Sequence, residues 1–380
     1  MATFTQIYTM VNDAAKEALG EQAITVKDTS SLVSLGEQVV SSDETKDIFT
    51  KTLVDKIART VVAIREYNPK HRSVKRDLVN WGLFVQKISY KKKEAVENPS
   101  YDFATQANPF DVEPSTEVIQ KLFGKISTWS YEDVIPDNQM FTAFDSAAQF
   151  GAFVSGIYTN INNSYALAEE NIENLAVNTY MAGVIKKGKA TQKRNLLAEY
   201  NTKHTGNELT VDSCLTSADF LKYASREINT VIGNMKKMSV LYNVEDIPRH
   251  TPADMMVVEI LGQFASATAS YLESDTYHKE LVSLPNYEEV AYWQAPGKDF
   301  AFENVSKIDI KNTDIDAAEI SQSGIIAFVH DYDAVACYID KPRQSSIYNP
   351  RAERTNVFYK ATQGYGADLS ENGVVFYIAA

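Results

Sequence analysis

The chain has 380 residues, of which 44% are hydrophobic, and a formal net charge of −13. This length allows one large domain or two to three smaller ones, and the hydrophobic content is enough for a sizeable core. The acidic balance argues against a general binder of nucleic acid or of anionic membranes.

The N-terminal region is predicted to form an arm, residues 1–76, with two short amphipathic helices. The first is capped by Thr3 and Gln6, ends at Gly20, and carries apolar residues at steps of three and four: Phe4, Ile7, Tyr8, Val11, Ala15 and Leu19. A polar, Ser-rich connector, Thr29–Ser42, is predicted next. Asp43 opens the second helix, whose apolar face is Phe49, Leu53, Ile57 and Val61. Because short helices are marginal alone, we expect the arm to lie on another surface and to be ordered mainly by neighbours.

A two-stranded excursion follows the arm. Residues 84–90 form the first strand, which ends in the polar run Lys91–Glu94, and Val118–Trp129 forms the second extended segment. Tyr131–Pro136 is predicted as the connection to the next helix. Such a hairpin is barely stable in a monomer, so we expect it to project from the subunit and to lie across a neighbouring one.

The longest predicted element is a helix over Gln149–Gly183. Asp145 and Ser146 suit its start, and Gly183 followed by Lys186 and Lys187 suits its end. An unbroken helix of this size is on the order of 50 Å long. The run Asn160–Ser164 marks a candidate kink.

The C-terminal half is predicted to be a mixed helix and strand region. Thr216 and Asp219 form a capping box for a helix whose apolar face is Phe220, Leu221, Ala224, Ile228, Ile232 and Met235. A short helix is expected around Glu273–Leu281. The predicted strands are Met255–Leu261, Val290–Trp293, Val305–Ile310, Ile325–Val329, Val335–Ile339, Thr355–Tyr359 and Val374–Ile378, and Asp331–Asp333 is a turn.

Charge is distributed unevenly along the chain. Residues 94–176 contain 13 acidic and two basic side chains, whereas residues 186–203 contain six basic side chains and one acidic one. Two interpretations stay open. The blocks are complementary and could pair between copies, or they are two separate solvated faces.

A search for catalytic chemistry finds no phosphate-binding, nucleophile-elbow, zinc-protease or dinucleotide motif. The best metal candidate is His330 with Asp331 and Asp333, but two ligand types on a turn do not make a closed site. Glu169 and Glu170 are adjacent on a helix and point apart, so they are not a catalytic pair. The basic run Lys70–Arg76 is interpreted as a solvated or partner-facing arm, and Gly364–Gly366 as a loop between strands.

No catalytic, cofactor-binding or metal residue is therefore predicted, and no cofactor. Cys214 and Cys337 lie in no metal-ligand spacing, so we expect free thiols in a reducing compartment. The sequence shows neither a signal segment nor an apolar run of ~18 residues, so we expect a soluble protein made in the cytoplasm.

The order of elements resembles the major capsid proteins of tailed phages, which adopt the Hong Kong 97-type fold, and most closely those of small protein-primed podoviruses. Ile48–Ile57 looks like their second arm helix and Phe150–Tyr158 like the start of their spine. Asp331–Val335 and Tyr348–Arg351 look like their strand turn and the stretch near their C-terminus. The likeness extends over most of the chain and is least clear over residues 285–325.

The resemblance implies an α+β fold with four parts: an N-terminal arm (1–78), an extended E-loop hairpin (79–138), a peripheral domain with the spine helix and long strands (139–202 and 326–380) and an axial domain (203–325). It implies a structural protein, not an enzyme, that self-assembles as pentamers and hexamers into an icosahedral or prolate head. That head encloses double-stranded DNA without sequence-specific binding and without a membrane. Scaffolding and portal proteins are the implied partners, and the virion head, assembled in the host cytoplasm, is the implied location.

Two alternatives remain at this point. The first is an encapsulin-like protein compartment with the same fold, which would need an internal pocket for cargo peptides. The second is a metal-dependent hydrolase using His330, Asp331 and Asp333, which a metal assay on purified protein would detect.

Overall fold

The protein was analysed as a computed structural model, which describes residues 4–27, 29–42, 44–53, 72–74, 76, 85–91, 117–123, 125–136, 147–275, 287–294, 305–313, 315–316, 318–339 and 343–379. Its α-helices are α1 (Phe4–Leu19), α2 (Thr29–Val40), α5 (Ala147–Lys187), α6 (Leu196–Lys203), α7 (Val211–Cys214), α8 (Ala218–Met235) and α9 (Gly262–Asp275), and residues 44–53 are also helical. Short 3-10 helices span Gly20–Gln22, Arg72–Val74 and Ala253–Met255.

The strands fall into four groups. The five-stranded sheet contains β4 (Lys193–Asn195), β13 (Gly373–Tyr377), β9 (Ile325–Asp331), β5 (Met256–Leu261) and β6 (Glu288–Val290), in that order. The four-stranded sheet contains β3 (Lys125–Pro136), β10 (Val335–Ile339), β11 (Arg343–Asn349) and β12 (Arg354–Ala367). Two separate pairs are β1 (Val85–Tyr90) with β2 (Val118–Phe123) and β7 (Ile308–Ile310) with β8 (Ile320–Gln322).

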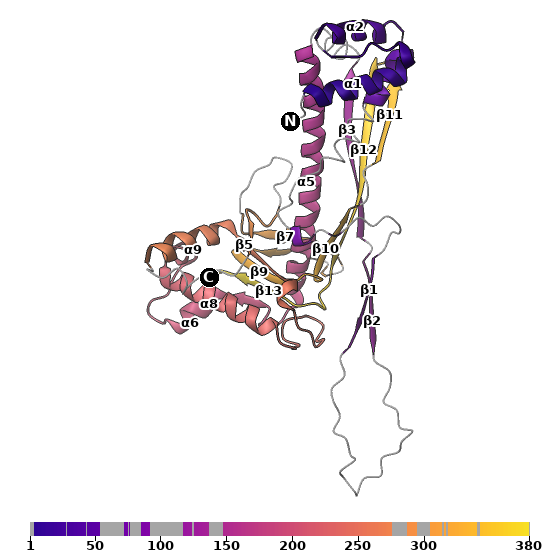
Figure 1. The fold of residues 1–380 in the computed structure, drawn as a ribbon. Helices are drawn as coiled ribbons and strands as arrows, with labels where there is room; N and C mark the ends of the chain where they lie inside the picture. The colour runs from indigo at the N-terminus through magenta and orange to yellow at the C-terminus, as the bar shows by residue number, and fades with distance from the viewer. Residues whose placement is uncertain are drawn as a thin grey trace, which may run out of the picture.

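Helix α5 runs beside the long strands from the N-terminal helices down to the five-stranded sheet (Figure 1). Its 41 residues correspond to about 60 Å, and it continues through Asn160–Ser164 without a break. The predicted end at Gly183 is four residues early. Gly183 lies inside the helix and is not a C-cap. A Cβ at this position would meet Leu369 at 2.7 Å, so the glycine allows close packing there.

The five-stranded sheet is covered on both faces. Helices α6, α8 and α9 lie on one face with Ile326, Val329 and Val374, while α5 lies on the other with Phe328 and Val375. Neighbouring residues such as Phe328 and Val329, or Val374 and Val375, therefore enter two different cores. All seven residues of β9 are buried as a result, which explains why this strand reads as a continuous apolar run.

The four-stranded sheet is built around β12. Strand β3 pairs with β12 along one side, and β11 and then β10 pair along the other. Tyr131–Pro136 is therefore strand, and the prediction of a connection there is wrong. Gly364–Gly366 is also strand, and the prediction of a loop there is wrong. A side chain at Gly366 would meet the ring of Phe123 at 2.9 Å, which explains the glycine inside the strand.

The N-terminal helices lie across one end of this sheet (Figure 1). The Thr29–Ser42 segment is mostly helix α2 rather than a connector, since Leu32, Leu35 and Val39 recur at helical spacing and are buried. The helices α1, α2 and 44–53 form one core with Ile135, Val357, Tyr359 and Ala361 of β3 and β12. The surface that the arm needs is therefore supplied, for these helices, by the same chain rather than by a neighbour.

Several predicted boundaries shift. Helix α8 is capped by Ser217, whose side chain accepts from the Phe220 N–H, and not by Thr216. Helix α9 spans Gly262–Asp275, and most of the short helix predicted around Glu273–Leu281 lies outside the described residues. The turn after Asp331 is confirmed, but the strands on either side of it belong to different sheets, so the chain crosses between the two sheets there.

Candidate functional site: the root of the β1–β2 hairpin

Strands β1 and β2 form an antiparallel ribbon that extends away from the rest of the subunit (Figure 1). Cross-strand partners share a face, so the ribbon has two distinct sides. Its outer face carries four apolar side chains that are 53–64% exposed: Ile88, Tyr90, Val118 and Leu122. Its inner face carries Lys87, Ser89 and Lys121, which turn toward the body of the subunit.

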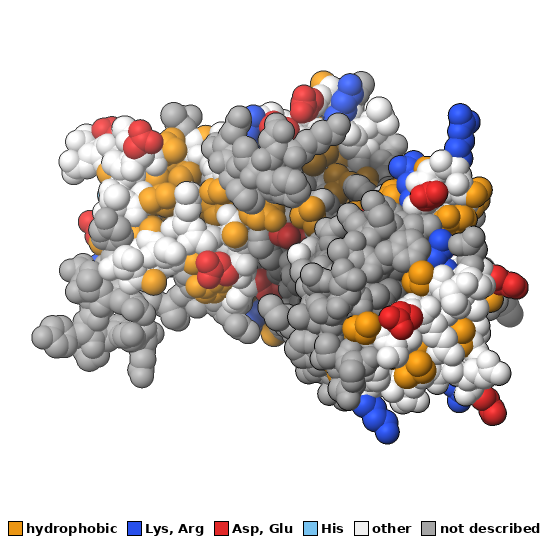
Figure 2. Space-filling view, turned by 90° about the horizontal axis from the view of Figure 1, so that it is seen from above, with side chains coloured by type: hydrophobic (Ala, Val, Ile, Leu, Met, Phe, Trp, Pro, Cys, Tyr) orange, Lys and Arg blue, Asp and Glu red, His pale blue; other side chains and the backbone are white. Residues whose placement is uncertain are grey.

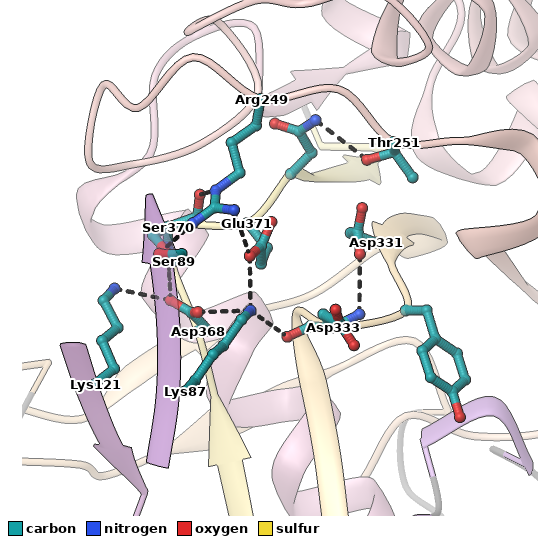
Figure 3. Close-up of polar contacts among 12 residues, drawn as sticks. Lys87, Ser89, Lys121, Arg249, Thr251, Asp331, Asp333, Asp368, Ser370 and Glu371 are labelled. Atoms are coloured by element: carbon teal, nitrogen blue, oxygen red, sulfur yellow. Dashed lines mark hydrogen bonds and ion pairs between the residues drawn. The ribbon is translucent and has the colours of Figure 1, made fainter. Parts of the chain in front are cut away.

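Lys87 and Lys121 lie directly opposite each other on the inner face. Like charges in this position destabilise a ribbon. Here both ammonium groups are held by Asp368, at 2.9 Å from Lys87 and 2.8 Å from Lys121. Lys87 also pairs with Glu371 at 2.6 Å, and Lys121 with Glu245 (Figure 3 shows the cluster around Lys87). The ribbon therefore depends on these carboxylates for its charge balance.

Asp368 and Glu371 belong to the loop 368–372, which joins β12 to β13. The Asp368 carboxylate is held in place by two hydrogen bonds within the loop: it accepts from the backbone N–H of Ser370 at 3.0 Å and from the Ser370 hydroxyl at 2.7 Å. Arg249 closes the cluster: it pairs with Glu371 at 3.0 Å and donates to the hydroxyl of Ser89 at 3.0 Å (Figure 3). Two segments of the body thus clamp the ribbon. We call Lys87, Lys121, Arg249, Asp368 and Glu371 the hairpin anchor.

The hairpin anchor is connected to the spine helix. The hydroxyl of Tyr180, on α5, donates to the carbonyl of Glu371 at 3.0 Å, and the Tyr180 ring packs on Phe328 with ring centroids 5.5 Å apart. Tyr180 is fully buried. The position of the loop 368–372 is therefore set by the spine helix and the sheet together.

Burial and ion pairing act in opposite directions on the anchor's pKa values. Burial raises the pKa of Asp368, but Lys87 and Lys121 hold it at about 2. Burial lowers the pKa of Lys87, but Asp368 and Glu371 raise it above the usual 10.5. For Glu371 burial prevails, and its pKa is raised despite Lys87 and Arg249.

The first expected result concerns acid. The pKa of Asp368 is lower in the folded chain than in the unfolded one, so its stabilising contribution is complete above about pH 4 and is lost as the pH falls toward 2. That shift corresponds to about 2 kcal/mol. Urea unfolding of the wild type and of Asp368→Asn should show a stability difference that is constant from pH 7 to 5 and shrinks by this amount below pH 4. A difference that stays constant down to pH 2 would contradict this assignment.

Beside the anchor lies an open pocket of about 170 Å³, lined by residues that include Phe123, Tyr338, Gly366 and Arg76. Arg76 donates to the carbonyl of Val335 at 3.1 Å, and its guanidinium lies 3.5 Å from the centre of the Tyr332 ring. Arg76, the last residue of the Lys70–Arg76 run, therefore holds this part of the chain against the turn between β9 and β10. We interpret this arrangement as a structural attachment.

The metal candidate does not assemble. His330 is fully buried on β9, stacked on Phe328, with its Nε2 3.9 Å from Glu259 and its Nδ1 2.8 Å from the carbonyl of Asp331. Asp331 accepts instead from the backbone N–H of Asp333 at 2.9 Å. Among the described residues, no group of three or more His, Cys, Asp or Glu side chains is placed to hold a metal ion.

The other sequence candidates also have structural positions. Glu169 and Glu170 are both buried on α5, and Tyr292 donates to Glu170. Cys214 and Cys337 are both buried and form no disulfide. Lys92 and Lys93 lie outside the described residues, whereas Lys91 pairs with Glu117 across the ribbon at 3.1 Å. No helix in the described part of the chain is long and apolar enough to cross a membrane.

Three cations of the basic block 186–203 have carboxylate partners within the chain that lie outside the acidic block 94–176. Lys186 pairs with Asp316 at 2.5 Å, Lys189 with Asp246, and Arg194 with Glu227 at 3.0 Å. Where the face in Figure 2 is described, blue and red side chains are interspersed rather than gathered in one field of a single sign. For these three cations, the structure gives pairing inside one subunit.

The described residues thus combine a long helix, α5, with a hairpin that is held at its root by ion pairs and has an apolar outer face. Solved structures share the fold. A chain in the capsid structure of Staphylococcus phage Andhra matches with a TM-score of 0.53 and 11% identity, over 80% of this chain and 82% of that one. A chain in the structure of the head fiber and inner core protein gp22 of native bacteriophage P68 matches with a TM-score of 0.52 and 12% identity, over 80% and 83%. No curated protein matches the sequence.

The chain thus shares an α+β fold with chains in these two phage structures. The Phi29-like phage major capsid protein family matches residues 11–377, and the chain belongs to this family. It is a structural protein of the phage head and not an enzyme. This decides against both the encapsulin-like compartment and the hydrolase.

Proposed function

We propose that the subunit builds its shell through the β1–β2 hairpin, whose outer face docks on a neighbouring copy while the hairpin anchor fixes its direction. The observation that carries the proposal is the contrast between the two faces. The inner face is tied to the body by ion pairs, and the outer face presents Ile88, Tyr90, Val118 and Leu122 to solvent. Four exposed apolar side chains in a row on a narrow ribbon are typical of a surface that is covered in an assembly.

The partner surface we propose is the outer face of the four-stranded sheet. Ile347, Asn356 and Val134 form one row across β11, β12 and β3, and Ile347 and Val134 are 61% and 41% exposed. The next row brings the half-buried Phe358 beside them. In these rows Asn356, Ser345 and Glu132 accompany the apolar side chains. Two sheets packed face to face lie about 10 Å apart, so the apolar face of the hairpin can cover this surface. Because the faces differ, the contact is heterologous and repeats around a ring.

In this proposal the chain is divided as the family resemblance implies: arm 1–78, E-loop hairpin 79–138, peripheral domain 139–202 with 326–380, and axial domain 203–325. The described arm helices bind their own sheet, so the hairpin makes the crossing contact. Pentamers and hexamers then form an icosahedral or prolate head around double-stranded DNA. Scaffolding and portal proteins assist, and assembly takes place in the host cytoplasm.

The test removes the apolar outer face. Tyr90→Ser with Leu122→Ser should reduce the yield of closed shells at least tenfold, because each side chain contributes about 1.5–3 kcal/mol when buried and the contact recurs at every copy. The melting temperature of the unassembled subunit should change little, since both side chains are exposed there. Electron microscopy and sedimentation measure the shells.

The matched control is Gln86→Ser with Gln120→Ser, which changes two polar residues on the same face of the ribbon. This control should assemble like the wild type. A destabilised subunit with unimpaired shells in the Tyr90 and Leu122 variant would show that the hairpin packs on its own subunit and would overturn the proposal.

A further inference from the structure

Strand β11 is an edge strand without a partner on its outer side among the described residues. It pairs with β12 through all seven of its residues, Arg343–Asn349, and no strand in the described part of the chain pairs with its other edge. Figure 1 shows β11 at the outer side of the four-stranded sheet, away from α5. Its outer row of backbone N–H and C=O groups is available for a further strand.

Within its own residues, β11 carries little of the usual protection against pairing. Natural edge strands are blocked by lysine, by an internal proline, by a bulge or by being very short. Strand β11 contains no lysine or proline, its register with β12 is continuous, and Arg343 is its only charged residue. An open edge of this kind, in a protein whose task is to assemble, points to a strand that is added from another chain.

The sequence of β11 fits a second copy of itself. An antiparallel pair centred on Ser346 places Arg343 opposite Asn349, Gln344 opposite Tyr348 and Ser345 opposite Ile347. No like charges meet in this register, and every residue of the strand has a partner. Because Ser346 faces its own copy, the contact is symmetric about a twofold axis and closes on itself.

The chain ends this ladder at a defined point. Pro350 has no backbone N–H and follows the strand directly, and the chain then turns, with the N–H of Ala352 donating to the carbonyl of Asn349 at 3.2 Å. In the twofold register, the residue opposite Pro350 is number 342, immediately before the strand of the other copy. The pairing is therefore limited to the seven residues at both ends.

We propose that β11 pairs with β11 of a second copy, antiparallel and centred on Ser346, so that two four-stranded sheets join into one continuous sheet. This twofold contact rests on the proposed shell function and is distinct from the heterologous hairpin contact. The hairpin links copies around a ring, and the β11 pair links two copies across a twofold axis. Together they give the two kinds of contact that a closed shell requires.

The decisive experiment places a cysteine at the axis. Residues opposite each other in an antiparallel pair have Cβ atoms about 4.5–5.5 Å apart, which a mild oxidant or a short bis-maleimide can bridge. Shells of Ser346→Cys should yield a covalent dimer on a non-reducing gel. The native Cys214 and Cys337 are buried and do not compete.

The matched control is Gln344→Cys. In the proposed register this residue is four positions from its own copy, roughly 13 Å along the strand, and should give no dimer. Equal cross-linking of both variants, or none in Ser346→Cys while its shells form normally, would overturn the twofold pairing and leave the proposed shell function intact. Failure of the wild type to form shells would instead overturn the proposed function.

Discussion

Replacing Asp368 by asparagine should lower the free energy of unfolding at pH 7 by about 3–5 kcal/mol, as expected when one partner of a buried ion pair is removed. The carboxylate is 2% exposed and holds both Lys87 and Lys121. Without it, two ammonium groups face each other across the ribbon with only Glu371 and Glu245 beside them. Urea unfolding of the subunit, followed by hydrogen exchange at the β1 and β2 amides, measures the effect.

The control for this prediction is Glu245→Gln. Glu245 pairs with Lys121 but is 40% exposed, and an exposed pair contributes roughly 0–1 kcal/mol. A compensating variant, Asp368→Asn with Lys87→Met and Lys121→Met, should recover much of the loss, because the opposed charges are gone as well. Equal losses in Asp368→Asn and Glu245→Gln would show that burial of the anchor has no energetic weight.

Replacing Gly373 by alanine should be nearly as damaging. A Cβ at this position would lie 2.8 Å from Cζ of Tyr180 and closer still to its hydroxyl. Tyr180 cannot retreat, since it is fully buried, donates to Glu371 and packs on Phe328. Overpacking of a rigid site costs typically 1–3 kcal/mol or more, and we expect about 3 kcal/mol here.

Gly233→Ala is the matched control. Gly233 lies within α8, and a Cβ there would meet nothing within 4 Å. The substitution should stabilise the subunit by up to ~1 kcal/mol, because alanine favours a helix over glycine. Adding Tyr180→Leu to Gly373→Ala should restore part of the stability. If Gly373→Ala and Gly233→Ala behaved alike in thermal unfolding, the close packing at Tyr180 would be refuted.

The long amphipathic and strongly apolar segments were predictable from the sequence. The periodicity of the spine, the face of α8 from Phe220 to Met235, and the apolar run of β9 each depend on burial that the residue types reveal directly. Helix α2 was not predicted, because its serines are typical of a polar connector even though Leu32, Leu35 and Val39 recur at helical spacing. Strand β11 was missed because Ser345 and Ser346 interrupt the apolar alternation, as an edge strand permits.

Two glycines led to wrong predictions of where an element ends. Gly183 and Gly366 both suggested the end of an element, yet each lies inside one, where the neighbours Leu369 and Phe123 leave no room for a side chain. A glycine needed for tertiary packing looks the same in the sequence as a glycine that ends a helix. Only the positions of residues far away in the chain distinguish the two.

The hairpin itself was predictable, and its anchor was not. Lys87 and Lys121 are separated from Asp368 by more than 200 residues, and no local pattern links them. The like charges on facing positions become visible only once the register of β1 and β2 is known. With that register, the need for a nearby carboxylate follows from electrostatics alone.

The hairpin anchor also determines how force travels through the subunit. Lys87 donates to the carbonyl of Asp333, in the turn between β9 and β10, and pairs with Asp368, in the loop between β12 and β13. These are the two places where a short turn or loop, rather than helix α5, carries the chain from one sheet to the other. A pull on the hairpin is therefore divided between both sheets and, through Tyr180, the spine helix, so several bonds share the load. We therefore expect a force on the ribbon to act at the junction of the two sheets. It would load the contacts of Lys87 with both sheets together, rather than the hydrogen bonds of one strand in sequence.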